Sequence, residues 1–233
     1  MLNIKQFLYS KDNFAYIIYS ENEAVAIDPG CPNEILSFLN KENLTLKQIL
    51  NTHTHHDHIC GNSELHNKTE IKPLKFKDLM DRKFIYVEKE SVEIISTPGH
   101  TMDSVCFKTD DFIVTGDTLF IANIGNCFTG KFSIYRESLD KVLASPDTLI
   151  VYPGHDYTER SIKRAKGIET KNEYIVDFWK KYNPPPVVSS IGWEKKINPY
   201  LRAHKKEVKR HLADNDKCVK TEFDCFKSFM KMY

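Results

Sequence analysis

The stretch 52–58 reads Thr-His-Thr-His-His-Asp-His and holds four of the nine histidines of the 233-residue chain. His53 and His55 lie two residues apart, so on extended backbone their side chains point the same way and can share one metal ion. Asp57 and His58 follow after a turn and can face a second ion. Imidazole nitrogens and carboxylate oxygens are the ligands that a cation such as zinc prefers. The string therefore predicts a metal site. The alternative interpretation is a run of surface histidines at a turn.

Short apolar runs separated by turn residues surround this string and predict a β-rich first half of the chain. The strands expected from these runs span 2–9, 14–20, 23–30, 48–53, 84–89, 92–100, 105–110, 112–117 and 148–155. Helical spacing of apolar residues predicts amphipathic helices, the first of them with Asn33 as its N-cap. These helices span 33–44, 133–145, 158–169 and 172–182, and residues 200–233 are also expected to be helical.

Three further metal-capable residues each follow a predicted strand at a glycine turn. His100 lies in Pro-Gly-His-Thr, Asp117 in Gly-Asp-Thr-Leu-Phe and His155 in Pro-Gly-His-Asp-Tyr-Thr. Each alone would more often be an ordinary turn residue, but together they supply the further ligands that two metal ions require. Because several strands end in such a residue, we expect a rigid sheet to present the site at its rim.

These motifs, with Asp-Pro-Gly at 28–30 and Asn-Pro-Tyr-Leu-Arg at 198–202, resemble those of the metallo-β-lactamase superfamily. Within it the chain looks like glyoxalase II, the hydroxyacylglutathione hydrolases, in order over essentially its whole length. The resemblance implies an α/β fold, the four-layer αββα sandwich, with a C-terminal helical region over the active-site mouth. The change from β-like to helical patterns places a boundary near residue 168. The resemblance implies that residues 1–168 form a metallo-β-lactamase-like catalytic domain and residues 169–233 a C-terminal helical substrate-binding region.

The resemblance also implies the metal ligands. His53, His55 and His100 would hold one ion, Asp57, His58 and His155 a second, and Asp117 would bridge both. Two divalent ions, with zinc expected and iron or manganese also fitting, would lower the pKa of a shared water and hold hydroxide at neutral pH. Attack of this hydroxide on a thioester carbonyl, with Asp57 orienting it, would convert S-D-lactoylglutathione to D-lactate and glutathione.

The expected partner is a small thioester, glutathione-derived, and its contacts are implied by the same resemblance. Tyr157 matches a family tyrosine after the last ligand histidine, while Arg202 and Lys205 stand where a basic pair would bind a glycyl carboxylate. The loop after Gly-Asp-Thr-Leu-Phe departs from the family. Asn126 stands where a lysine is expected, and Phe128 where a tyrosine is expected. Glutathione would then bind more weakly, or the natural thiol is a different one.

The formal net charge of +1 gives no overall argument for nucleic acid or a membrane as a partner, and neither is expected. Residues 195–233 hold eleven Lys/Arg against five Asp/Glu, net +6, which leaves −5 for the first 194 residues. This basic segment suggests an anionic contact, although a solvated lysine-rich helix explains it as well. No apolar stretch approaches the ~20 residues that span a bilayer, and no secretory signal is visible, so a cytoplasmic location is expected.

Six cysteines are scattered without a Cys-x-x-Cys pair, which favours reduced thiols. They are Cys31, Cys60, Cys106, Cys127, Cys218 and Cys225. None matches a ligand or nucleophile of the resembled family, and Cys60 and Cys106 are expected to be small core residues.

Three other functions fit part of the pattern. A persulfide dioxygenase of the same fold would use one iron, held by residues matching His53, His100 and Asp117. A complete second ligand set argues against it. A nuclease of the superfamily would need a broad basic surface, which the net charge of −5 over the first 194 residues opposes. A non-enzymatic metal-binding protein is the third alternative.

Overall fold

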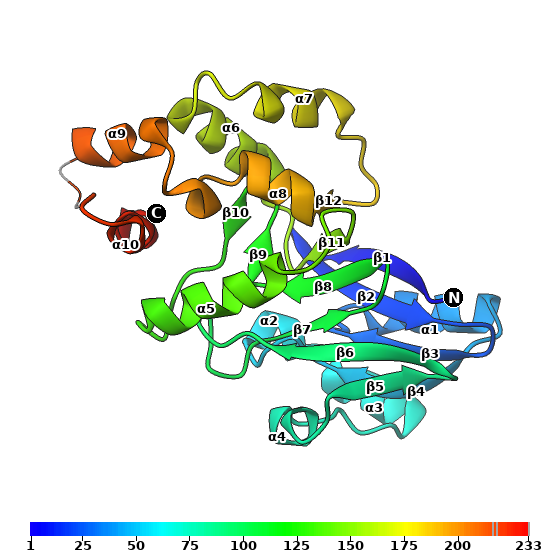
Figure 1. Ribbon diagram of the computed structural model, residues 1–233. Coiled ribbons are helices and arrows are strands. Elements are labelled where there is room, and N and C mark those ends of the chain that lie inside the picture. Colours follow the sequence, from blue (N-terminus) through cyan, green and yellow to red (C-terminus); the bar gives the residue numbers. More distant parts are fainter. Residues whose placement is uncertain (216, 218, 233) are drawn as a thin grey trace.

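The structure is a computed structural model that describes residues 1–215, 217 and 219–232, and most of its strands form two sheets (Figure 1). The first sheet has the order β1-β2-β3-β4, antiparallel except for the parallel pair β3 and β4. Its strands are β1 (Asn3–Tyr9), β2 (Asn13–Tyr19), β3 (Glu23–Ile27) and β4 (Thr45–Leu50). All four are confirmed predictions, although β4 ends before the histidine string instead of running into it.

The second sheet has the order β12-β11-β8-β7-β6-β5, antiparallel except for the parallel pair β8 and β11. Its strands are β5 (Phe84–Val87), β6 (Glu90–Ser96), β7 (Val105–Lys108), β8 (Phe112–Gly116), β11 (Ile150–Pro153) and β12 (Ser189–Ser190). A separate pair consists of β9 (Leu119–Phe120) and β10 (Asn123–Ile124). The two-residue strands are absent from the prediction because so short a run has no readable period.

Helices connect some of the strands after β3 and form most of the C-terminal part of the chain. In the first two-thirds of the chain they are α1 (Pro32–Lys41), α2 (His56–Ile59), α3 (Asn62–Thr69), α4 (Phe76–Met80) and α5 (Phe132–Leu143). The later ones are α6 (Thr158–Ile168), α7 (Glu173–Lys181), α8 (Ile191–Ile197), the 3₁₀ turn η1 (Pro199–Arg202), α9 (Lys206–Asp214) and α10 (Glu222–Met232).

The inner faces of the two sheets form one apolar core. Phe14, Tyr16 and Ile18 alternate along β2, and they share this core with Phe107 of β7 and Val114 of β8. Period-two alternation puts the intervening residues on the opposite face of each sheet. Each sheet therefore has a second apolar face that another layer must cover.

Helices cover both outer faces. Ile17 of β2 packs in one cluster with Ile35 and Leu39 of α1, whereas Ile113 of β8 packs in another with Leu139 of α5. Burial of such faces is the driving force that stacks secondary-structure layers. The order helix, sheet, sheet, helix confirms the predicted four-layer αββα sandwich.

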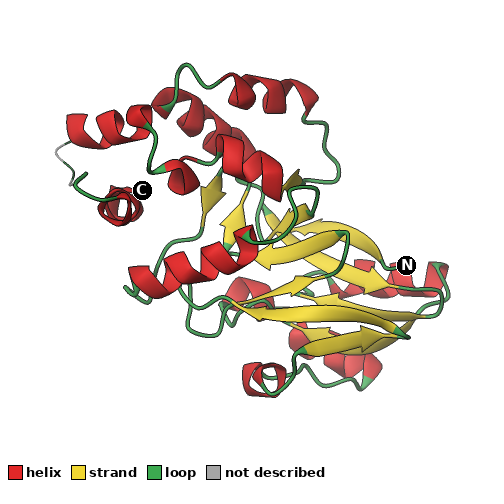
Figure 2. Cartoon of the chain, viewed as in Figure 1, coloured by secondary structure: helices red, strands yellow, loops and turns green. Residues whose placement is uncertain are grey.

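The C-terminal helices gather at one end of this sandwich (Figure 1). Figure 2 shows that this C-terminal part of the chain is mostly helical. Val208 of α9 and Phe229 of α10 belong to the same apolar cluster as α5. The predicted C-terminal helical region is therefore present and shares a core with the sandwich. The domain boundary expected near residue 168 would fall at the end of α6, and it stays a prediction.

Two local expectations are wrong. Helix α1 begins at Pro32 with Cys31 as its N-cap, not Asn33, because proline sets φ for the first helical position. Cys60 is exposed, since it follows the short helix α2 at the surface, whereas Cys106 is buried as expected. Cys218 lies outside the described residues, and the other five cysteines are free thiols. Among the described residues, no helix is long and apolar enough to cross a bilayer.

A buried carboxylate ties helix α8 to the turn between β9 and β10. Oε2 of Glu194 accepts hydrogen bonds from the backbone N–H of Ala122 and from Nδ2 of Asn198, both at 2.9 Å. Nδ2 of Asn198 also donates to the backbone oxygen of Asn123 at 2.9 Å. Burial raises the pKa of Glu194 to about 7, against the opposing effect of its hydrogen bonds.

This raised pKa gives the fold a pH dependence. Folded Glu194 holds a proton that the unfolded chain releases near pH 4.5, so its contribution to stability falls as pH rises from there to about 7. The melting temperature of Glu194→Gln, a neutral isostere, should therefore rise relative to wild type between about pH 5 and about pH 8. Glu194→Ala should lose about 1–3 kcal/mol for each buried donor left unpaired.

Thermal unfolding at several pH values measures both effects, with Glu173→Gln on the exposed face of α7 as the matched control. Parallel pH profiles for wild type and Glu194→Gln would contradict the assignment.

Candidate metal centre

Four segments that follow strand ends meet at one edge of the sandwich. His53 follows β4, His100 follows β6, and Asp117 and His155 follow β8 and β11. Backbone hydrogen bonds fix the segments to one another: Val105 N–H donates to the oxygen of Thr52 at 2.8 Å, and Gly154 N–H to that of Gly116 at 2.9 Å. The rim position expected from the sequence is therefore the one observed.

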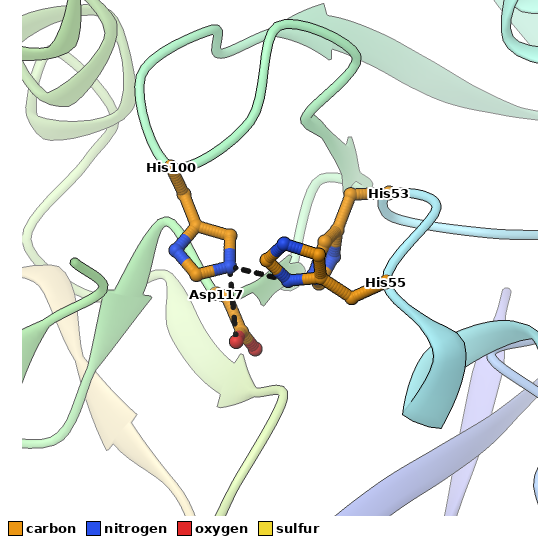
Figure 3. A group of neighbouring side chains, drawn as sticks. All are labelled: His53, His55, His100 and Asp117. Carbon is orange, nitrogen blue, oxygen red and sulfur yellow. Dashed lines mark hydrogen bonds and ion pairs between the residues drawn. The ribbon is translucent and has the colours of Figure 1, made fainter. Parts of the chain in front are cut away.

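Three imidazoles and one carboxylate form the first ligand group (Figure 3). Nδ1 of His55 lies 2.9 Å from Nε2 of His53 and 3.0 Å from Nε2 of His100. Oδ2 of Asp117 lies 3.4 Å from Nε2 of His100. All four donor atoms lie within 4.8 Å of one another, which suits ligation of a single cation.

The second group consists of Asp57, His58 and His155, again with donor atoms within 4.8 Å of one another. Nε2 of His58 and Nε2 of His155 are 3.2 Å apart. Oδ2 of Asp57 lies 3.3 Å from Nε2 of His155. Asp117 reaches this group too, with Oδ1 3.3 Å from Nε2 of His58 and Oδ2 3.5 Å from Nε2 of His155. Its carboxylate thus stands between the two groups.

The outward ring nitrogen of three histidines is held by an acceptor. Nδ1 of His58 donates to Asp28 at 2.9 Å, Nδ1 of His155 to Asp12 at 2.9 Å, and Nδ1 of His100 to the backbone oxygen of Asn126 at 2.8 Å. Since a carboxylate or carbonyl only accepts, each of these rings carries a proton on Nδ1, so in its neutral form the lone pair of Nε2 faces inward. This is the arrangement that orients histidine for a metal ion.

Burial and neighbouring charged groups shift the pKa values of the site residues. Burial, and then His58, lower the pKa of His53 to about 2, so its ring is neutral and able to ligate. Burial lowers the pKa of His58, but Asp28 and Asp117 outweigh burial and hold that pKa well above its ordinary value. Burial raises the pKa of Asp117, yet His58, His155 and His53 together outweigh burial and hold this pKa well below its ordinary value.

Asp117 carries the feature that fits a metal most directly. Its Oδ1 is buried and accepts no hydrogen bond from the described residues. A side chain at Gly154 would overlap this oxygen, so glycine is required for the close approach of the two segments. A buried carboxylate oxygen without a donor is costly unless a cation faces it. The two groups therefore fit a pair of divalent ions that share Asp117.

A cavity of about 450 Å³ opens beside both groups, within the size range of small-molecule sites. Besides ligand residues, its lining comprises Phe120, Asn123, Ile124, Gly125, Asn126, Phe128, Tyr157, Arg160, Arg164 and Tyr200. The ring of Tyr157 stacks on that of His155, with centroids 4.9 Å apart, and the exposed Phe128 meets His55 and His100 edge-on.

The structure brings together all seven predicted ligands, and Asn126, Phe128 and Tyr157 line the adjoining cavity. It does not bring Arg202 or Lys205 there, and this expectation is corrected. The guanidinium of Arg202 forms a double hydrogen bond with the buried Glu169, at 2.7 and 2.9 Å. Both basic residues face a different groove, between α7 and α9.

Sequence reasoning missed the residues that support the ligands. Asp28 accepts from the N–H of Thr52 at 2.8 Å and from its hydroxyl at 2.6 Å, besides holding His58. Asn13 donates to Oδ2 of Asp57 at 2.8 Å. The Asp-Pro-Gly motif offered a signal for Asp28, whose φ of 51° is one that aspartate tolerates better than most residues. Nothing local distinguishes Asn13.

Comparison with known proteins gives the same architecture from the sequence alone. The family model described as metallo-beta-lactamase superfamily matches residues 11–86 and 81–155, and the model described as hydroxyacylglutathione hydrolase C-terminus matches residues 156–232. A hydroxyacylglutathione hydrolase of Vibrio cholerae is 32% identical over 230 residues, covering 91% of either chain. The chain belongs to the hydroxyacylglutathione hydrolase family of this superfamily. The Psychromonas ingrahamii hydroxyacylglutathione hydrolase is 30% identical, covering 100% of this chain and 97% of its own.

Solved structures agree with the fold of this hydroxyacylglutathione hydrolase family member. ETHE1 from Myxococcus xanthus matches with a TM-score of 0.69 and 24% identity, over 98% of this chain and 90% of that one. BLEG-1 B3 metallo-beta-lactamase matches with a TM-score of 0.64 and 22% identity, over 85% and 99%. At these identities the likeness shows the fold alone. The predicted family and fold are confirmed, while the roles of individual ligands stay predictions.

Asp28 gives a test of the metal centre that leaves every predicted ligand in place. Asp28→Asn should weaken binding at the group containing His58 by about 10–100-fold, because the imidazole loses the carboxylate that orients it. Competition with a coloured chelator measures the affinity of each ion. Asp110→Asn, at an exposed aspartate away from the site, is the control. Unchanged affinities in a variant that melts like wild type would remove Asp28 from this role.

Proposed function

We propose that this chain is a two-metal thioester hydrolase that converts S-D-lactoylglutathione, or a related hydroxyacyl thioester, to the acid and the free thiol. The observation that carries this proposal is the pair of ligand groups that share Asp117 and open into one cavity. Relatives named hydroxyacylglutathione hydrolase, at 30–32% identity over nearly the whole chain, support the choice of substrate.

Each donor set suits a divalent cation of borderline softness, and zinc is the metal we propose, with iron and manganese as alternatives. When bound, two such ions supply the Lewis acidity that brings the pKa of water at the site toward neutrality and polarises a thioester carbonyl. A reducing compartment, the cytoplasm, would suit the free thiols of the described cysteines.

Residues around the groups would orient the reactants. Asp57 is proposed to accept a hydrogen bond from the attacking water and to aim it at the carbonyl carbon. Burial opposes ionisation of Asp57, but His58 and the hydrogen bond from Asn13 lower its pKa, so it remains an acceptor. Burial, and then Asp12, raise the pKa of Tyr157 to about 12, so its hydroxyl stays protonated and can donate to the substrate.

The thiol part of the substrate would lie along the loop that carries Asn126 and Phe128. Both side chains are exposed at the cavity, whereas the backbone oxygen of Asn126 holds His100. Recognition by these side chains can therefore change without moving a predicted ligand. We also propose that the C-terminal helical region, residues 169–233, covers the cavity and binds the substrate.

The competing proposal is a persulfide dioxygenase with one iron. It would leave Asp57, His58 and His155 without a task, although these three form a complete second group next to the first. The likeness to ETHE1, at 24% identity, bears on the fold alone. We therefore rank hydrolysis above oxidation.

The reaction class is tested by loading metal-free protein with zinc or iron and assaying thioester hydrolysis beside oxygen uptake. We expect hydrolysis of S-D-lactoylglutathione that chelation abolishes and metal restores, with two ions bound per chain and no oxygen consumed. One bound iron with oxygen consumption on a persulfide substrate would replace this proposal by the dioxygenase.

The bridge is tested at Asp117. Asp117→Ala should lose at least one ion and nearly all hydrolysis, because both groups then lack their shared carboxylate. Elemental analysis of the purified variant and its turnover measure the two effects. Retention of both ions and full turnover would refute the bridging assignment.

The unusual loop is tested by restoring the family residues. Asn126→Lys with Phe128→Tyr should lower KM several-fold with little change in kcat, on the scale of ~1–2 kcal/mol of recovered hydrogen bonding. Initial rates over a range of S-D-lactoylglutathione concentrations separate the two constants. If the double variant is worse, and a thioester of another thiol is the better wild-type substrate, then the loop is adapted to that thiol.

A further inference from the structure

One wall of the cavity is cationic. Arg160 and Arg164 stand one helical turn apart on α6, so their side chains project from the same face, and both line the cavity. Tyr200 of η1 lines it beside them. The other charged groups of the lining, Asp57, Asp117 and the histidines, belong to the two ligand groups. The α6 arginines are thus the charges in the lining that the metal centre does not use.

Both guanidinium groups are held in place by aromatic residues. That of Arg160 lies over the ring of Tyr157, 3.7 Å from its centroid. Nη1 of Arg164 donates to the hydroxyl of Tyr200 at 3.3 Å. A guanidinium that is already positioned loses less conformational entropy when it binds a carboxylate.

Unlike Arg202, Arg160 has no ion-pair partner among the described residues, so its guanidinium can bind an anion. No carboxylate of the described residues forms an ion pair with Arg160, which is exposed at the cavity. Arg202, by contrast, is paired with Glu169. On the loop that lines the same cavity, position 126 carries a neutral asparagine. The arginine side chains that line this cavity therefore both come from α6.

We propose that Arg160 and Arg164 form an anion subsite that binds the terminal carboxylate of the thiol part of the substrate. This inference rests on the proposed function for its substrate, and it adds a specificity: thioesters of anionic thiols are favoured over those of neutral thiols. The fork of each guanidinium matches a carboxylate with two parallel N–H···O hydrogen bonds. Tyr157 and Tyr200 act as positioning residues for the two arginines.

Binding to metal-free protein tests the subsite without catalysis. Calorimetry compares glutathione with its glycine amide, which lacks the terminal carboxylate, on wild type and on Arg160→Gln, Arg164→Gln and the double variant. Each single change should weaken glutathione binding about tenfold, the loss expected of a hydrogen bond to a charged group, and should leave binding of the amide unchanged. Lys163→Gln, an exposed lysine on α6 outside this cavity, is the control and should bind both ligands like wild type.

Kinetics on the metal-loaded enzyme give a second readout. For S-D-lactoylglutathione the arginine variants should raise KM about tenfold with kcat nearly unchanged, and the dependence of KM on salt should weaken. The lactoyl thioester of N-acetylcysteamine, a neutral thiol, should be hydrolysed by wild type and variants alike. Arg164→Lys, which keeps the charge but not the fork, should fall between wild type and Arg164→Gln.

Several results would overturn the subsite. They are wild-type glutathione affinity in the double variant, equal losses for glutathione and its amide, or no preference of wild type for glutathione over the amide. Absence of thioester hydrolysis in wild type would instead reject the proposed function, while the binding comparison still judges the two arginines. If Arg164→Gln fails to fold, Arg160→Gln on the exposed turn carries the test.

Discussion

A buried carboxylate surrounded by imidazoles sets the requirements for the rest of the structure. Asp117 has His58, His100 and His155 within 3.5 Å, each from a different segment of the chain. A carboxylate in such a place is stable only if positive charge compensates it. Protons on the histidines compensate it in part, as the raised pKa of His58 indicates. Divalent cations would do so more completely, which couples the stability of this edge of the fold to the metal centre.

Metal binding and substrate recognition rest on different parts of the fold. The ligands follow the ends of β4, β6, β8 and β11, and supporting residues such as Asp28 and Asp12 fix the orientation of the rings. The proposed recognition of substrate falls to side chains that line the cavity, Phe128 on a loop and the arginines of α6. Strand ends hold geometry more tightly than loops do. Substrate preference can therefore vary while the reaction stays the same.

Most of the fold and the candidate ligands could be predicted, because the signals are local. Period-two runs mark the strands, and His53, His55, Asp57 and His58 sit within one heptapeptide. The substrate contacts could not be predicted in the same way. Arg202 pairs with Glu169, 33 residues earlier, and only the packing of α6 against η1 brings the two together. The same packing decides which face of α6 lines the cavity. Because this packing is not visible in the sequence, the sequence alone does not distinguish Arg160 from a solvent-exposed residue on the surface of a helix.

The central claim is that two ions work together across Asp117. Stepwise addition of zinc to metal-free protein, with thioester hydrolysis measured at each step, tests it most directly. The account predicts that activity reaches its maximum only as the second equivalent of metal binds. Full activity at one equivalent, with no further gain from the second, would contradict it.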